Sequence, residues 1–172
     1  DKHAPTELAL RGRVLFSLCL ACQDIGDWNR AATLADEGVT LAERVGEESQ
    51  IGSALIQRGE MLRLRGATDD ALECFSRAEK VFEGIGDKGG VGRAVGGLGS
   101  VLWKKGEYDE ATACFVRAAE IFEALGNRAG LARNVGGQGI VYAERHDFEA
   151  ALKCYEEAEG MQPFLLLETE RQ

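Results

Sequence analysis

The sequence predicts an all-α fold, a right-handed α-solenoid of four antiparallel helix-hairpin repeats. Similar residues recur at intervals of 40 positions, and within each unit apolar residues recur three and four positions apart, which is the helical period. The only 2 prolines, Pro5 and Pro163, stand close to the ends of the chain. Because proline interrupts helices, a long interior without it favours them.

The 40-residue period appears as columns of glycine, alanine and aromatic residues. The clearest columns are Gly59, Gly99 and Gly139; Ala31, Ala71, Ala111 and Ala151; Phe75, Phe115 and Tyr155; and Ala78, Ala118 and Ala158. They divide a single domain, residues 1–172, into repeats at about 13–52, 53–92, 93–132 and 133–161, with 162–172 as a C-terminal tail or cap. One hairpin cannot bury its apolar face alone, so neighbouring repeats must stack.

Each repeat is expected to contain two helices. The apolar spacing places the first helices at 7–24, 50–65, 90–105 and 128–145. Left-handed caps are expected at the glycine column Gly26, Gly66 and Gly106, which ends in His146. Carboxylates near the positive end of the helix dipole open the second helices at Asp27, Asp69, Asp109 and Asp147. Gly86-Asp87 and Gly126-Asn127 start the next units.

These columns resemble the tetratricopeptide-repeat family. Repeat 4 follows the family pattern of glycine, alanine and aromatic positions with Gly139, Tyr142, His146, Phe148, Ala151, Tyr155 and Ala158. Repeat 1 departs most, with Cys19 for glycine, Ala35 for an aromatic residue and Gly38 for alanine. The unit is longer than the ordinary repeat of about 34 residues. In this respect it is similar to the variant in kinesin light chains and Pins-type spindle adaptors.

The resemblance implies a non-catalytic scaffold that binds a partner peptide or protein in a concave groove lined by the first helices. The groove residues that it implies, together with the nearby Asn134, are Arg13, Gln57, Arg63, Arg93, Gly97, Ser100, Trp103, Arg133, Asn134, Gly137 and Ile140. Related long-repeat proteins often carry asparagine where this chain has Gly97 and Gly137, and Asn134 is at best a partial substitute. Two alternatives stay open: an assembly module in which copies associate through the solenoid ends, and a regulatory segment of a larger signalling or transcription protein.

Charge is expected to separate between the groove and the rest of the chain. The net charge of −9 argues against nucleic acid as a partner. The first helices nevertheless contain 11 basic and 4 acidic residues. One interpretation is a basic groove for an acidic peptide, and the other is the preference of cations for the last turn of a helix. The early positions of Arg13, Arg93 and Arg133 favour the first interpretation.

Glycines crowd the third and fourth of the first helices. Gly96, Gly97, Gly136 and Gly137 are expected to face the groove, where they would let a partner's backbone lie close. The alternative interpretation is drift in a tolerant repeat. Each glycine inside a helix costs about 0.5–1 kcal/mol relative to alanine, so their number calls for a reason.

No residue set indicates catalysis, a cofactor or a metal site, and we expect no enzyme. The 5 cysteines are expected to pack as reduced thiols, including Cys19 and Cys22. No apolar run reaches the length of a membrane span, and the chain shows no secretion signal, so a cytoplasmic location is expected. The apolar segment 163–167 is expected either to cover the last repeat or to dock a partner or a second copy.

Overall fold

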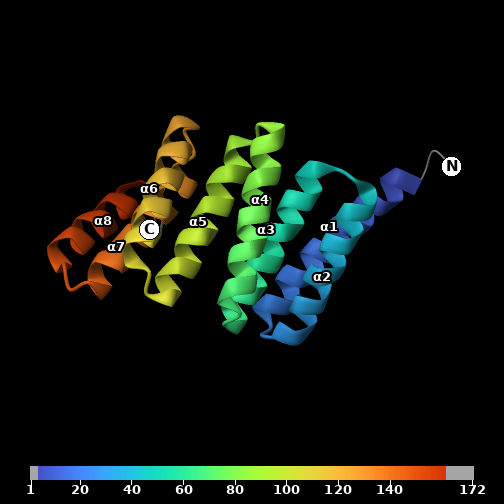
Figure 1. The fold of residues 1–172 in the computed structure, drawn as a ribbon, viewed down its shortest axis with the longest axis horizontal. Helices are drawn as coiled ribbons and strands as arrows, with labels where there is room; N and C mark the ends of the chain where they lie inside the picture. Colours follow the sequence, from blue (N-terminus) through green and yellow to red (C-terminus); the bar gives the residue numbers. More distant parts are fainter. Residues whose placement is uncertain (1–3, 162–172) are drawn as a thin grey trace, which may run out of the picture.

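A computed structural model describes residues 4–161 of the chain, and the side chains of residues 10–12, 14–22 and 24–161. This part of the chain forms eight helices joined by short turns and contains no strand (Figure 1). The helices are α1 (Ala4–Asp24), α2 (Trp28–Val45), α3 (Glu48–Arg65), α4 (Thr68–Ile85), α5 (Lys88–Lys105), α6 (Tyr108–Ala124), α7 (Arg128–Glu144) and α8 (Phe148–Met161). The four first helices of the sequence analysis correspond to α1, α3, α5 and α7.

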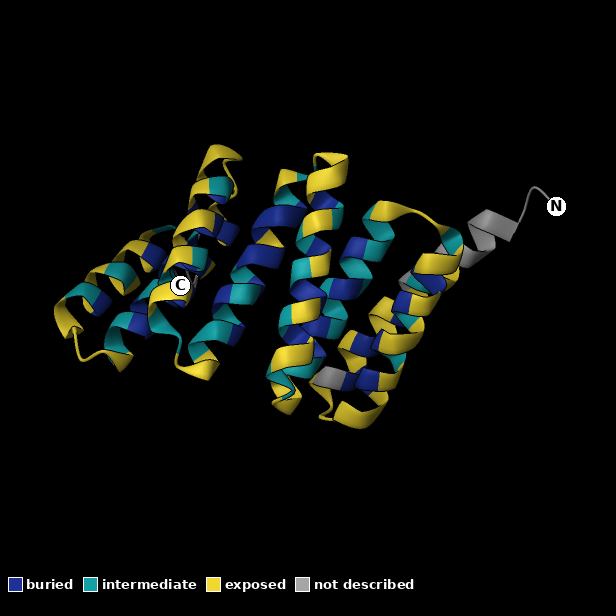
Figure 2. Ribbon diagram, viewed as in Figure 1, coloured by how far each residue is buried: buried dark blue, intermediate teal, exposed yellow. Residues whose placement is uncertain are grey.

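The helices stack in chain order. Each helix packs against the next one, and the first helices also contact one another in the pairs α1–α3, α3–α5 and α5–α7. Figure 1 shows the resulting array, with α1 and α2 at one end and α7 and α8 at the other. In Figure 2 buried and exposed residues alternate along the helices, as expected when each helix buries one side. The predicted helical solenoid is confirmed, whereas the segment 162–172 lies outside the described residues.

Local sequence signals explain where the helices end. A left-handed backbone, with φ between 65° and 81°, occurs at Gly26, Gly46, Gly66, Gly86, Gly106 and Gly126. Side-chain caps follow at four helix starts: the carboxylate or amide oxygens of Asp27, Asp87, Asn127 and Asp147 accept backbone N–H bonds of 2.9 to 3.1 Å. Asp69 and Asp109 lie in the first turn instead, because Ala67 and Glu107 occupy the cap positions of α4 and α6.

His146 takes the glycine position at the end of α7 with a φ of 62°, the one positive φ of a non-glycine residue within 4–161. A side chain in this conformation is strained, so His146→Gly is expected to raise the free energy of unfolding by about 1 kcal/mol. The gain is reduced by loss of the edge contact between His146 and Phe148, whose ring centroids lie 5.8 Å apart. Urea denaturation measures the change. The reciprocal variant Gly106→His should lose stability, and equal stability of both variants and wild type would contradict this explanation.

The core between repeats consists largely of phenyl rings that rest on glycines. Phe82, which is 1% exposed, lies between Gly52 on α3 and Gly90 on α5. A Cβ atom would lie 2.6 Å from this ring at Gly52 and 2.2 Å from it at Gly90. Side-chain carbons do not approach this closely, so the ring requires glycine on both helices.

The same arrangement recurs along the solenoid. Phe75 lies between Gly59 and Gly97, where an added Cβ would lie 3.0 and 2.3 Å from the ring. The other ring and glycine sets are Phe115 with Gly99 and Gly137, Phe122 with Gly92 and Gly130, and Tyr155 with Gly139. The glycines that crowd α5 and α7 therefore have a packing role, and most are not drift.

Candidate functional site: the concave groove

A cavity of about 490 Å³ lies along the first helices α3, α5 and α7, with ring edges from α6 and α8 in its wall. We call it the central groove. Its wall consists of Glu60, Arg63, Gly92, Arg93, Gly96, Gly97, Ser100, Trp103, Phe115, Phe122, Ala132, Arg133, Asn134, Gly136, Gly137, Ile140, Tyr155 and Ala158. It combines cationic, apolar and hydroxyl groups over successive repeats.

Nine of the eleven residues predicted for a groove lie in this wall. They are Arg63, Arg93, Gly97, Ser100, Trp103, Arg133, Asn134, Gly137 and Ile140. Gln57 lies instead in a second cavity, between α1, α2 and α3, and the side chain of Arg13 lies outside the described residues. The structure thus brings most of these residues together, while their role in binding stays a prediction.

The prediction missed the contribution of the second helices. Phe115, Phe122 and Tyr155 reach the groove wall from α6 and α8. The aromatic column at 75, 115 and 155 is a signal for two of them, because a ring that packs against a first helix also approaches the groove.

The groove wall holds three arginines and one glutamate. Arg63 forms an ion pair of 2.7 Å with Glu60 on the same helix. The exposed Arg93 places its guanidinium carbon 5.4 Å from the centroid of the Phe82 ring, a cation–π geometry. Arg133 is exposed and forms no ion pair or hydrogen bond with the described residues. Arg93 and Arg133 therefore carry positive charge that no ion pair with the described residues offsets.

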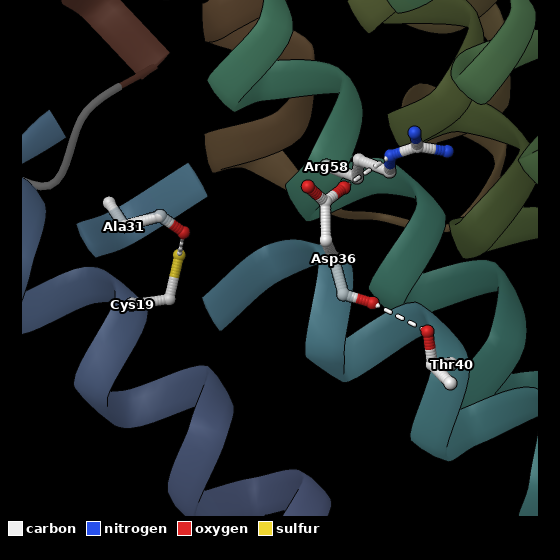
Figure 3. Close-up of polar contacts among 5 residues, drawn as sticks. All are labelled: Cys19, Ala31, Asp36, Thr40 and Arg58. Atoms are coloured by element: carbon white, nitrogen blue, oxygen red, sulfur yellow. Dashed lines mark hydrogen bonds and ion pairs between the residues drawn. The ribbon is translucent and has the colours of Figure 1, made fainter. Parts of the chain in front are cut away.

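Most other cations of the first helices bind neighbouring repeats. Arg58 on α3 pairs with Asp36 on α2 at 2.7 Å, and Figure 3 shows this pair beside the Thr40 hydroxyl, which donates to the Asp36 carbonyl. Further along, Lys105 pairs with Asp69 at 3.1 Å and Arg145 with Asp109 at 2.6 Å. Many of the basic residues on the first helices therefore form contacts between repeats. Fewer of them contribute positive charge to the groove than the sequence suggests.

Two of the groove glycines have a packing role that the sequence interpretation did not include. From the sequence we expect a partner's backbone to lie close to Gly97 and Gly137. In the structure the rings of Phe75 and Phe115 fill this space, at 2.3 and 2.7 Å from where a Cβ would stand. A Cβ at Gly96 would likewise lie 2.6 Å from Asn134 Oδ1, and of the four glycines only Gly136 faces open space.

Asn134 is also committed within its own helix. Its side chain is 3% exposed, and its Nδ2 donates a 2.8 Å hydrogen bond to the Gly130 carbonyl. Because the residue is buried and one of its two amide N–H groups is already used, Asn134 is poorly placed to act as the partial clamp.

The cysteines pack in or against the core. Cys19 and Cys22 are buried beside Ala31, Ala35 and Met61, and the Cys19 thiol donates to the Ala31 carbonyl at 3.3 Å (Figure 3). Desolvation by burial raises the pKa of the Cys74, Cys114 and Cys154 thiols. They stay protonated at neutral pH, which makes them poor nucleophiles.

Neither a metal site nor a membrane span is found in the described part of the chain. Its histidine, cysteine and acidic side chains form no group of three that could hold a metal ion. Among the eight described helices, none combines the length and apolar character needed to cross a bilayer.

The fold and the groove define a helical-repeat solenoid, and comparison with known proteins identifies the repeat. A tetratricopeptide-repeat family model matches residues 91–163, which confirms the repeat type that the sequence columns indicate. Repeats of this family are generally non-catalytic protein-interaction modules. No curated protein sequence shows a significant match to this chain.

Two solved structures share the fold over much of the chain. The crystal structure of BtubC (BKLC) from P. vanneervenii is 18% identical with a TM-score of 0.75, over 90% of this chain and 64% of that one. The tetratricopeptide-repeat domain of Arabidopsis FLU is 22% identical with a TM-score of 0.62, over 66% of this chain and 96% of that one. This chain therefore spans about two thirds of the length of BtubC, and both likenesses concern the fold alone.

Proposed function

We propose that this chain is a non-catalytic scaffold that binds an acidic peptide or protein segment in the central groove. One observation carries the proposal: Arg93 and Arg133 are exposed in one groove wall, one repeat apart, and neither forms an ion pair with the described residues. Trp103 and Ile140 add apolar surface to the same groove wall. Cations around an apolar strip are complementary to a peptide that carries both carboxylates and apolar side chains.

The test is a charge reversal of both arginines, Arg93→Glu/Arg133→Glu. A pool of Asp/Glu-rich peptides and its Asn/Gln counterpart serve as probes, with affinity measured by fluorescence anisotropy at low and high salt. The variant should bind the acidic pool at least about tenfold more weakly, because each lost charge contact contributes about 1 kcal/mol. Binding by the wild type should weaken as salt rises, since both arginines are exposed.

The matched control is Arg30→Glu/Arg44→Glu on α2. Both arginines are exposed, and neither lies in the central groove wall, yet the net charge changes by the same amount. The control should bind like the wild type. An affinity that is equal for both pools, flat with salt, or equally reduced in the control would overturn the acidic-partner proposal.

A second candidate is association of copies through the solenoid ends. Apolar residues are exposed on both outer helices: Leu10, Val14 and Leu18 on α1, and Phe148, Leu152 and Tyr155 on α8. On the inner helices the equivalent surfaces are largely covered by the neighbouring hairpin. A mass above that of the monomer in light scattering would favour this candidate. As a segment of a larger regulatory protein, the chain would bury these ends against further repeats.

A further inference from the structure

The second cavity, which we call the repeat-1 pocket, has a volume of about 500 Å³ and lies between α1, α2 and α3. Its wall includes Phe16, Leu34, Ala42, Gln50, Ala54 and Gln57. Helix α3 contributes to both cavities, with Gln57 in the repeat-1 pocket and Glu60 in the central groove. The two cavities therefore adjoin across one helix.

The equivalent space in later repeats is filled by phenyl rings of the chain itself. At an offset of 40 residues, Ala42 corresponds to Phe82, and Ala35 corresponds to Phe75. The next offset leads to Phe122 and Phe115, which are buried in the same way. Repeat 1 therefore lacks both rings. Ala42 lines the repeat-1 pocket, whereas Ala35 is buried beside Cys19 and Met61 and does not line it.

On α3, glutamines replace the glycines that lie under those rings on the following first helix in later repeats. Gly90, which lies under Phe82, corresponds to Gln50, and Gly97, which lies under Phe75, corresponds to Gln57. A ring at position 42 would collide with a side chain at 50, because a Cβ at Gly90 would lie only 2.2 Å from the Phe82 ring. At both positions the ring and the glycine of the following first helix are lost together, whereas Gly12, the equivalent of Gly52, is retained. The pocket therefore results from coordinated changes on α2 and α3, the two helices that meet at this contact between hairpins.

The chemistry of the wall indicates the occupant. Phe16, Leu34, Ala42 and Ala54 provide apolar surface, and Phe16 is 44% exposed. The half-buried Gln57 makes no hydrogen bond to the described residues, whereas the Gln50 amide donates to Glu47. An apolar cavity is favourable for an apolar group of matching size, and leaving an amide near its rim without a partner is unfavourable.

We infer that the repeat-1 pocket binds an aromatic side chain supplied by the partner. The ring takes the place beside Ala42 that Phe82 and Phe122 fill in repeats 2 and 3, and the Gln57 amide bonds the backbone that carries it. This inference deepens the proposed function, because the aromatic residue belongs to the same peptide that crosses α3 into the central groove.

The experiment uses the whole chain and two small probes, N-acetyl-L-phenylalaninamide and N-acetyl-L-alaninamide. Methyl NMR signals of Leu34, Ala42 and Ala54 report occupancy of the pocket. The phenylalanine probe should shift them saturably, and the alanine probe should not. No saturable shift with the phenylalanine probe, or equal shifts with both probes, would overturn the inference.

Two variants fill the pocket by different routes. Ala42→Phe/Gln50→Gly rebuilds the Phe82 and Gly90 pair in repeat 1. Gly38→Leu needs no rearrangement at its Cβ, because an atom there meets nothing within 4 Å. Each should abolish the saturable shift, so the result does not depend on one variant folding. A folded variant that binds the phenylalanine probe like the wild type would count against the pocket.

The experiments can overturn the acidic-partner proposal and the aromatic-pocket inference independently of one another. Arg93→Glu/Arg133→Glu should retain binding of the phenylalanine probe, because neither arginine lines the repeat-1 pocket. Loss of acidic-peptide binding with intact probe binding supports both proposals. Absence of probe binding with salt-sensitive binding of acidic peptides overturns the aromatic pocket alone.

Discussion

Replacing Gly97 with alanine is expected to lower the free energy of unfolding by about 1–3 kcal/mol, the usual cost of overpacking a core. The new Cβ would lie 2.3 Å from the Phe75 ring, which is 0% exposed and has no room to move away. In a solvent-exposed helix the same change stabilises by about 0.5–1 kcal/mol, because alanine is the better helix former. Because of the ring contact, the substitution is expected to lower the free energy of unfolding instead of raising it.

Gly136→Ala is the matched control for this prediction. Gly136 also lies in the middle of a first helix and in the groove wall, but a Cβ there meets nothing within 4 Å. The free energy of unfolding of the Gly136→Ala variant, measured by urea denaturation, should rise by about 0.5–1 kcal/mol. If Gly97→Ala and Gly136→Ala both raise the free energy of unfolding, the close contact between the Phe75 ring and Gly97 is contradicted.

Replacing Phe75 with alanine is expected to have the largest effect, a loss of about 3–5 kcal/mol, as for other buried phenylalanines. The ring is fully buried beside Ala71 and Val101 and joins α4 to the first helices on both sides. Circular dichroism during urea denaturation measures the loss. Phe148→Ala is the control of matched type: Phe148 is 65% exposed, and its loss should be under about 1 kcal/mol.

The same ring provides a direct test of coupling. In the Phe75→Ala background, Gly97→Ala should no longer destabilise, since the added methyl group enters the space that the ring has left. The double-mutant cycle should give a coupling energy of about 1–3 kcal/mol between the two positions. Additive effects would contradict the contact. Phe75→Ala alone gives position 75 the residue that repeat 1 carries at the equivalent position, Ala35.

The same rings also bear on the two proposed binding surfaces. In repeats 2 and 3 they fill the contact between hairpins and leave the central groove above them. In repeat 1 the contact itself is open. One solenoid thus offers two surfaces, a cationic groove over α3, α5 and α7 and an apolar pocket at α1 to α3.

The sequence by itself determined the period, the number of described helices and nearly all their ends. Left-handed glycines and side-chain caps act within a few residues of the chain, so their effect can be predicted locally. Even the exception at His146, where a side chain adopts the glycine conformation, occurs in the expected column. The groove residues also came together largely as predicted, because they occupy repeated positions on the first helices.

The tertiary structure alone decided what the repeated residues face. Gly97 and Gly136 look alike in sequence, yet one lies under a ring and the other faces open space. Arg58 and Arg93 are both first-helix arginines, yet one pairs with the preceding repeat and the other stays free of ion pairs with the described residues. The space beside a glycine and the ion pairs of an arginine both depend on side chains that other helices contribute. The helical period sets only the direction of a residue, and packing between repeats determines what it meets.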